Sequence, residues 1–226
     1  MRANTMGDWD DVWRRVSPGR SWAKRRIVDV LARLDWEKDG DVMDLGCGSG
    51  ALSAMMGESF PEARLWLVDS SERAIELARE NVAPERGARF VQISFEDMGS
   101  GSAPELDKMM GRFSLVYTDG LLEHFPRAEQ GHIITVCRRL LADGGLQVHV
   151  VPNRYHPWQL VRPFVIRGIP ESPFTRHDHR AAVAAAGLSE ELEGHGGISV
   201  LPTGYSPEGL GEYVGMLRWF ALRRRG

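Results

Sequence analysis

The sequence predicts an α/β fold with three layers, in which helices cover both faces of one mostly parallel sheet. Three observations indicate this class. Short apolar runs alternate with amphipathic helical stretches from residue 42 to about residue 151, which is typical of a parallel sheet. A glycine-rich loop directly follows the first apolar run. Two weaker strand candidates near the C-terminus complete a seven-stranded sheet as a hairpin, so that the last strand is antiparallel.

The N-terminal third is expected to be helical. Two helical pieces flank a breaker at residues 17–19, Ser-Pro-Gly. In the second piece Ser21 can cap the helix, and apolar residues recur at helical spacing: Ile27, Val30, Leu31 and Leu34. We therefore expect two helices in this region.

Five strands are expected in the central part of the chain. They lie near residues 42–45, 64–68, 89–93, 113–118 and 145–151. The second strand precedes an amphipathic helix that Ser70 or Ser71 can cap, with Glu72 in its first turn. Residues 99–104, GSGSAP, are expected to be a flexible surface connection.

The pattern changes after Val151. Residues 152–174 are rich in proline and aromatic residues and show neither helical nor strand period, so we interpret them as a lid or pocket wall. Residues 176–187 are expected to be helical. The two weaker strand candidates follow, around 190–201 and 215–223. An alternative for the last one is a helix that begins at Glu208.

The glycine-rich loop is the most informative part of the chain. The sequence VMDLGCGSG (42–50) is a buried strand with an acidic residue, Asp44, followed by Gly46, Gly48 and Gly50. Glycine lets backbone N–H groups approach a ligand closely at such a strand-to-helix junction. Ala51 stands where a dinucleotide-binding loop has its third glycine. A carboxylate at Asp44 suits an ammonium or sulfonium group better than a diphosphate. The alternative is a tight structural turn.

The second strand carries a further acidic residue. Asp69 ends the run RLWLVD, about twenty residues beyond the loop. An acidic residue at that strand end can accept hydrogen bonds from both hydroxyls of a ribose. The alternative is an ordinary turn residue at the end of a strand.

These motifs together resemble the class I S-adenosylmethionine-dependent methyltransferases, in particular their small-molecule (type 11/12-like) members. VMDLGCGSG is similar to the glycine-rich motif of that family, and LWLVDSSERAIELAREN to its second strand and following helix. The similarity continues through FVQISFEDM, FSLVYTDGLLEHF and CRRLLADGGLQVHVVPN, and covers roughly residues 25 to 153. The resemblance implies a Rossmann-like doubly wound fold, S-adenosyl-L-methionine as cofactor and S-adenosyl-L-homocysteine as product.

The resemblance also implies a set of cofactor-binding residues. Ser94 departs from the family pattern, because an Asp that binds the adenine amino group usually stands there; Glu96 or Asp97 can replace it, and Phe95 can lie against the adenine ring. Thr118 or Asp119 is expected near the methionine moiety. The full expected set is Asp44, Gly46, Cys47, Gly48, Gly50, Asp69, Ser70, Phe95, Glu96, Thr118, Asp119 and Leu121.

The acceptor side is less well defined by the sequence. Methyltransferases that act on the amino groups of adenine or glutamine carry Asn/Asp-Pro-Pro-aromatic where this chain has TDGL (118–121), which argues against those substrates. A general base is needed if the acceptor is a hydroxyl or a protonated amine, and His124 is the leading candidate. It is equally compatible with a helix-start residue bonded to backbone. Other candidates are Glu123, Tyr117, His149 and His156.

Two further features remain open from the sequence. Trp9, Trp13 and Trp22 either pack on the sheet edge or, as the N-terminal helices of related methyltransferases do, cover the substrate pocket. His177-Asp178-His179 suggests a metal cluster at first sight. Adjacent helical positions point apart, however, so we interpret it as a helix N-terminus and expect no metal.

Length and composition set outer limits. The 226 residues suit a single domain, made of a helical cap (1–40), a cofactor-binding core (41–151), a lid insertion (152–175) and a C-terminal part (176–226). A net charge of −3 and a pI near 6.2 give no global field for nucleic acid or membrane. Two distant cysteines and no signal peptide or membrane span indicate a cytoplasmic protein.

The sequence therefore predicts an enzyme that methylates a small molecule, as a monomer or homodimer. Three alternatives stay open: an RNA or protein methyltransferase, a catalytically silent subunit that binds S-adenosylmethionine, and a nicotinamide oxidoreductase. The last would need the glycine spacing that Ala51 breaks.

Overall fold

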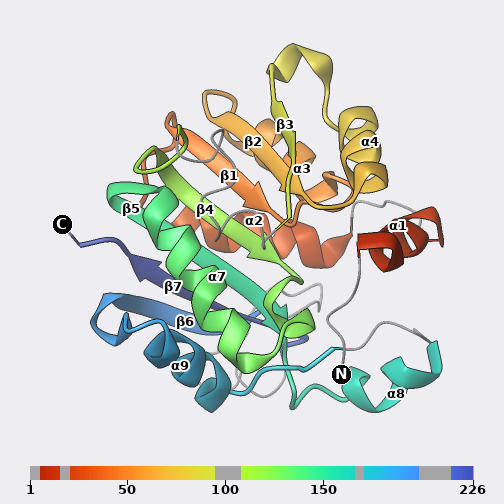
Figure 1. Cartoon of the computed structure of the whole chain (residues 1–226), viewed down its shortest axis with the longest axis vertical. Coiled ribbons are helices and arrows are strands. Elements are labelled where there is room, and N and C mark those ends of the chain that lie inside the picture. The colour runs from red at the N-terminus through yellow and green to blue at the C-terminus, as the bar shows by residue number, and fades with distance from the viewer. Residues whose placement is uncertain (1–5, 16–20, 95–107, 166–170, 199–214, 226) are drawn as a thin grey trace.

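The computed structural model describes residues 6–15, 21–94, 108–165, 171–198 and 215–225 (Figure 1). Its centre is a seven-stranded sheet with the order β3-β2-β1-β4-β5-β7-β6, in which only β7 runs antiparallel to its neighbours. The strands are β1 (Asp41–Leu45), β2 (Arg64–Asp69), β3 (Arg89–Gln92), β4 (Phe113–Asp119), β5 (Leu141–Pro152), β6 (Leu192–Ile198) and β7 (Leu217–Arg223). This confirms the predicted fold class.

Helices cover both faces of the sheet. They are α1 (Met6–Arg15), α2 (Trp22–Arg33), α3 (Ala51–Ser59), α4 (Glu72–Asn81), α7 (Arg127–Leu140), α8 (Trp158–Val165) and α9 (Arg176–Ala185), with short 3-10 turns η1 (Pro84–Arg86), η2 (Leu122–His124) and η3 (Ser189–Glu191). Figure 1 shows α7 and α9 in front of the sheet and α2 and α3 behind it. Each face has its own buried apolar cluster, so the fold has two cores separated by the sheet.

Local capping explains where several helices begin. Ser71, rather than Ser70, caps α4, because its side chain accepts a hydrogen bond from the Ala74 N–H. Thr175 and Asp178 form a reciprocal capping box at the start of α9. The run His177-Asp178-His179 is therefore a helix N-terminus, as predicted. The described helices are too short or too polar to span a bilayer.

The segment after β5 differs from the prediction. Residues 158–165 form a helix, α8, although the sequence shows no clear helical period there. Pro157 lies just before the helix, where a missing N–H costs nothing, and the Nδ1 of His156 accepts from the Trp158 N–H at 3.1 Å. This side-chain cap stabilises the start of the helix in a segment that is rich in proline. The 99–104 connection lies outside the described residues. The last strand candidate, around 215–223, is strand β7 (Leu217–Arg223), so the alternative of a helix that runs from Glu208 through this segment is wrong.

The order of strands determines where a ligand can bind. Going along the chain, the sheet grows from β1 to β2 and β3 on one side, and from β4 to β5 on the other. In open parallel sheets, ligands bind at the carboxyl ends of the strands where this order reverses. The reversal here lies between β1 and β4, next to Asp44 and Tyr117, which are paired across the two strands.

Candidate active site

A cavity of about 240 Å³ lies at this point of the sheet. Its floor comes from the ends of β1 and β2, one side from the residues after β4, and its cover from α1. Nine of the residues expected from the sequence line it: Asp44, Gly46, Cys47, Gly48, Asp69, Ser70, Asp119, Leu121 and His124. The structure thus brings most of the predicted site together.

The glycine loop folds back over the end of β2. The N–H groups of Gly46 and Cys47 both donate to the Val68 carbonyl, at 2.8 and 3.0 Å. Gly48 has φ +51°, and a Cβ there would overlap the Trp13 ring, so α1 lies directly on the loop backbone. Gly50 lies outside the cavity. A Cβ at Gly50 would be 2.9 Å from the Cα of Ala78, so this glycine lets α3 approach α4.

Asp69 connects the loop to the start of α4. Its Oδ2 accepts a hydrogen bond from the Gly48 N–H at 2.8 Å, and its Oδ1 accepts one from the Ser71 N–H at 3.0 Å. Burial raises the pKa of this carboxyl, and the bonds from backbone N–H groups oppose that rise. The side chain lines the cavity, so a ligand hydroxyl can reach an oxygen that already holds the loop in place.

Asp44 lies deeper, at the end of β1. Its residue is 2% exposed, and its Oδ2 accepts hydrogen bonds from the hydroxyls of Ser53 (2.6 Å) and Tyr117 (3.1 Å). Burial raises the pKa of Asp44 to about 7. Lys24 and Asp119 also line the cavity and form an ion pair of 2.8 Å between Nζ and Oδ2. Asp44 is thus poised to ionise when a cation binds near it.

Lys24 was missed by the sequence-based interpretation. It belongs to the run Lys24-Arg25-Arg26, which resembles a solvated helix face. In the structure its position in the first turn of α2 directs the ammonium into the cavity rather than into solvent. The sequence of α2 contains a weak indication that Lys24 faces the protein. Lys24 precedes the buried Ile27 and Val28 by three and four residues, and residues so spaced share one face of a helix.

Helix α1 supplies the cover of the cavity. Trp9 and Trp13 line it, while Trp22 on α2 is 63% exposed and takes no part. Asp10 accepts a hydrogen bond from the Ser71 hydroxyl, which fastens α1 to the start of α4. The Trp9 ring meets the His124 ring edge to face, with 4.8 Å between centroids. Trp9 and Trp13 therefore cover the pocket rather than pack on the edge of the sheet.

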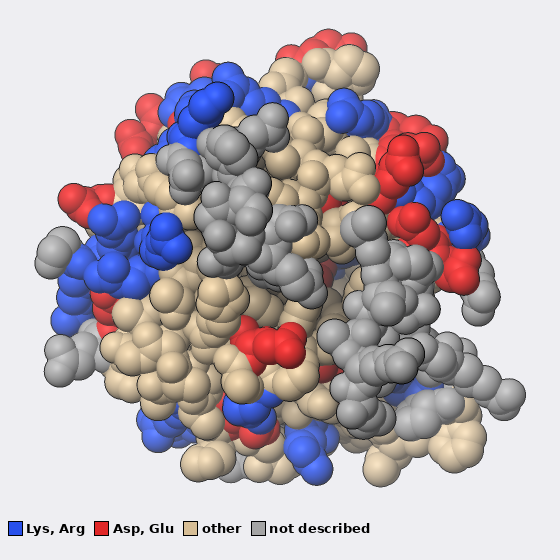
Figure 2. Space-filling view, in the orientation of Figure 1, with Lys and Arg blue, Asp and Glu red and all other residues tan. Residues whose placement is uncertain are grey.

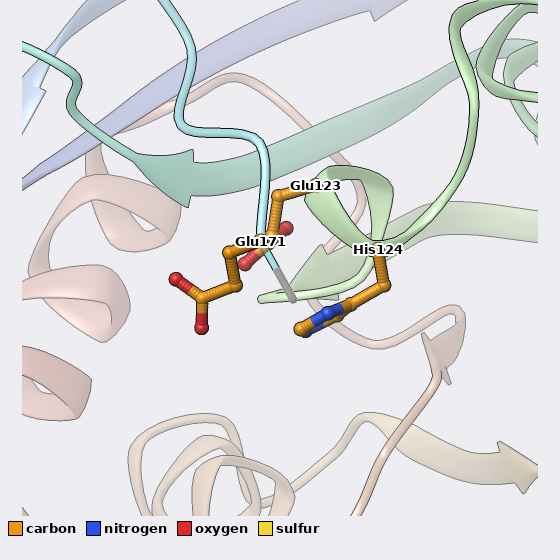
Figure 3. A group of neighbouring side chains, drawn as sticks. All are labelled: Glu123, His124 and Glu171. Atoms are coloured by element: carbon orange, nitrogen blue, oxygen red, sulfur yellow. The ribbon is translucent and has the colours of Figure 1, made fainter. Parts of the chain in front are cut away.

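The residues after β4 form the other end of the cavity. His124 and Glu171 line it, and Glu123 lies next to them with only 3% of its surface exposed (Figure 3). Burial raises the pKa of Glu123 well above its usual range and also raises that of Glu171. Glu171 forms an ion pair with Arg162 of α8. Glu171 was not expected from the sequence, because the segment before α9 shows no pattern that singles it out.

Several candidate residues lie elsewhere. Thr118 is fully buried and its hydroxyl is 3.0 Å from Nδ1 of His149, so it does not line the cavity. Burial lowers the pKa of His149 to about 3, which keeps that ring neutral and away from the acceptor. Tyr117 bonds Asp44 and His156 caps α8. Phe95 and Glu96 lie outside the described residues; nearby Ile93 lines the cavity.

Sequence comparison places the core among methyltransferases. Residues 42–145 match a family model described as a methyltransferase domain. Trans-aconitate 2-methyltransferase of Acidovorax ebreus is 30% identical over 149 residues, 66% of this chain and 51% of that protein. Ribosomal RNA large subunit methyltransferase G of Shewanella amazonensis is 31% identical over 132 residues, 56% of this chain and 32% of that protein. The chain thus spans about half the length, or less, of these curated relatives.

Solved structures share the fold. A chain from the complex between the Haloferax volcanii Trm112 methyltransferase activator and a methyltransferase aligns over 100% of both chains, with a TM-score of 0.69 and 18% identity. Human N-acetylserotonin methyltransferase in complex with S-adenosylmethionine aligns over 98% of this chain and 55% of that one, with a TM-score of 0.62 and 14% identity. The family match and the loop geometry assign residues 42–145 to the S-adenosylmethionine-dependent methyltransferases, whose cofactor is S-adenosylmethionine, and the solved structures show that the chain has the class I fold of that family.

Proposed function

We propose that this protein transfers a methyl group from S-adenosylmethionine to a small molecule that is neutral or cationic. The observation that carries the proposal is that the glycine loop, Asp69, His124 and helix α1 line one and the same cavity. A cofactor and a compact acceptor can meet there, with little water between them.

The residues present fit the cofactor. Asp69 lies at the end of β2, where its carboxylate can accept hydrogen bonds from a ribose, and Gly46 and Gly48 line the cavity without Cβ atoms. Asp44 suits the methionine ammonium and Lys24 its carboxylate. We assign the adenine ring to the side of Ser70 and Ile93, with Phe95 and Glu96 as further contacts. Asp119, Leu121 and His124 also line the cavity.

Methyl transfer makes modest demands on the protein. The cofactor supplies an electrophilic methyl group on a sulfonium with a good leaving group. The protein then has to align the acceptor in line with that bond and keep water out. For an acceptor that carries a proton, His124 accepts it, and Trp9 holds the imidazole ring from the side of α1.

The charge of the cavity favours a neutral or cationic acceptor. Four carboxyl groups, those of Asp44, Asp69, Asp119 and Glu171, line the cavity against one ammonium group, that of Lys24, so an anionic acceptor would be repelled. The relatives named for trans-aconitate act on an anion, and this feature argues against that substrate here. On the face shown in Figure 2, Lys and Arg are interspersed with Asp and Glu, which does not favour a continuous groove for RNA.

We treat residues 1–226 as one domain with the four parts predicted from the sequence, acting in the cytoplasm as a monomer or homodimer. Both cysteines, Cys47 and Cys137, are buried free thiols, which suits a reducing compartment.

Transfer of labelled methyl groups to a cell extract, followed by size fractionation, tests the proposal. We expect label in the low-mass fraction. Label in a nuclease-sensitive fraction would instead identify RNA as the acceptor. The ribosomal RNA methyltransferases among the relatives raise this possibility. Calorimetric binding of S-adenosylmethionine without any transfer would indicate a silent binding subunit, and a folded sample that binds neither cofactor nor product would refute the proposal.

A further inference from the structure

Three side chains at the acceptor end can share one ion. Glu123 and His124 come from η2, and Glu171 from the segment that precedes α9 (Figure 3). One ligand atom from each lies within 4.8 Å of the others. Ligands on opposite sides of a divalent ion, each at about 2.0–2.4 Å, are about 4–4.8 Å apart. The group is therefore compact enough for one metal ion after small side-chain adjustments. Across the described parts of the chain, no second group of this kind occurs.

Glu123 gives independent evidence for a cation-binding site. It is 97% buried, and its Oε2 has no hydrogen-bond partner among the described residues. A buried carboxylate oxygen without a partner is costly, and the neighbouring charges of Asp119 and Glu171 add to that cost. Arg162 is the nearby cation, and its ion pair with Glu171 engages Oε1 of that residue.

We propose, on the basis of the methyltransferase function proposed above, that Glu123, His124 and Glu171 bind one divalent transition-metal ion such as Mn²⁺ or Zn²⁺. Two carboxylates and one imidazole are a mixed oxygen and nitrogen set, which suits these ions better than Mg²⁺ or Ca²⁺. Three protein ligands leave open positions on the ion. Because His124 and Glu171 line the cavity, those positions face the acceptor.

The metal defines the acceptor class more narrowly. The acceptor is a hydroxyl compound whose oxygen coordinates the ion. Coordination to the ion lowers the pKa of that hydroxyl toward neutral pH. The hydroxyl proton is lost to water, an O–C bond forms to the methyl group, and the C–S bond breaks with its electron pair passing to sulfur. In this state the metal-bound nitrogen of His124 cannot accept a proton, so the ion takes over the task assigned to a base.

Metal binding is measured on the full chain after treatment with a chelator, by titration with MnCl₂ and electron paramagnetic resonance of free Mn²⁺. We expect one saturable site per chain. Glu123→Gln and Glu171→Gln should each weaken Mn²⁺ binding by at least ~10-fold, since loss even of groups that support metal ligands costs 10- to 100-fold. Glu129→Gln removes an exposed carboxylate from the first turn of α7 and is the matched control.

The outcomes separate this site from the proposed function. Circular dichroism checks that each variant folds, and calorimetry with S-adenosylmethionine on the same samples checks the cofactor site. Absence of saturable Mn²⁺ binding by a wild-type sample that binds S-adenosylmethionine would overturn the metal site alone. Equal Mn²⁺ affinity in wild type, Glu123→Gln and Glu171→Gln would also overturn it. Failure to bind the cofactor would instead count against the methyltransferase function.

Discussion

Replacement of Asp69 by alanine tests the cofactor site most directly. This carboxylate accepts hydrogen bonds from the Gly48 and Ser71 N–H groups, at 2.8 and 3.0 Å. Alanine removes both bonds and the acceptor for the ribose hydroxyls. The loss of ribose contacts should weaken S-adenosylmethionine binding by about 1–3 kcal/mol, which is about a 5- to 150-fold rise in Kd.

The same change should also affect stability, because the Gly48 and Ser71 N–H groups lose their partner. Each charge-assisted bond is worth about 1.5–3 kcal/mol, but removal of a partly buried charge offsets part of that loss. We therefore expect the free energy of unfolding to fall by about 1–3 kcal/mol. Asp69→Asn keeps one acceptor oxygen and should fall between wild type and alanine on both measures.

Titration calorimetry gives the Kd, and urea unfolding gives the stability. Glu62→Ala is the matched control, because Glu62 is exposed just before the opposite end of the same strand, β2. The assignment of Asp69 is refuted if folded Asp69→Ala binds S-adenosylmethionine as tightly as wild type. A lower stability with unchanged affinity would leave Asp69 a purely structural residue.

Three further changes probe other parts of the cavity. Because burial raises the pKa of Asp44 to about 7, above about 3.9 in the unfolded chain, the stability due to its bound proton is lost as pH rises from about 4 to about 7. In urea unfolding at several pH values, the free energy of unfolding of Asp44→Asn should not show this decrease. The same pH dependence in wild type and Asp44→Asn would contradict the prediction. Gly48→Val should abolish calorimetric binding of S-adenosylmethionine in a chain that still unfolds cooperatively, because φ is +51° there and the added Cβ overlaps the Trp13 ring that covers the loop. His124→Gln should lower kcat by about 10²–10⁴-fold and leave cofactor affinity unchanged; weakened cofactor binding would place His124 elsewhere.

The sheet and the cofactor loop could be predicted because their signals are local in sequence. The strand of Asp44, the positions of Gly46 and Gly48, and the acidic end of β2 at Asp69 each follow from a short pattern. Strand alternation also separates Thr118 from Asp119. Neighbouring residues of a strand point to opposite sides, so Asp119 lines the cavity while Thr118 faces His149.

Lys24 and Glu171 could not be predicted in the same way, because each reaches the cavity through contacts between segments that are distant in the sequence. Lys24 has the sequence context of an ordinary solvated helix residue, and its role depends on how α2 packs against the end of β4. Glu171 precedes α9 in a segment without any period, and it reaches the cavity because the Ser172 N–H donates to the Glu123 carbonyl at 2.9 Å. Sequence patterns contain no information on such contacts between distant segments.

The charge of the cavity connects cofactor binding to turnover. Among the described lining residues, Lys24 carries the only fixed positive charge, against the carboxyl groups of Asp44, Asp69, Asp119 and Glu171. S-adenosylmethionine carries a positive sulfonium, whereas the product has a neutral thioether sulfur. An acidic cavity therefore attracts the cofactor more strongly than the product, and the attraction weakens at the moment of transfer. The same field that repels an anionic acceptor should thus favour release of S-adenosylhomocysteine, which competition calorimetry at low and high salt can measure as a difference that salt reduces.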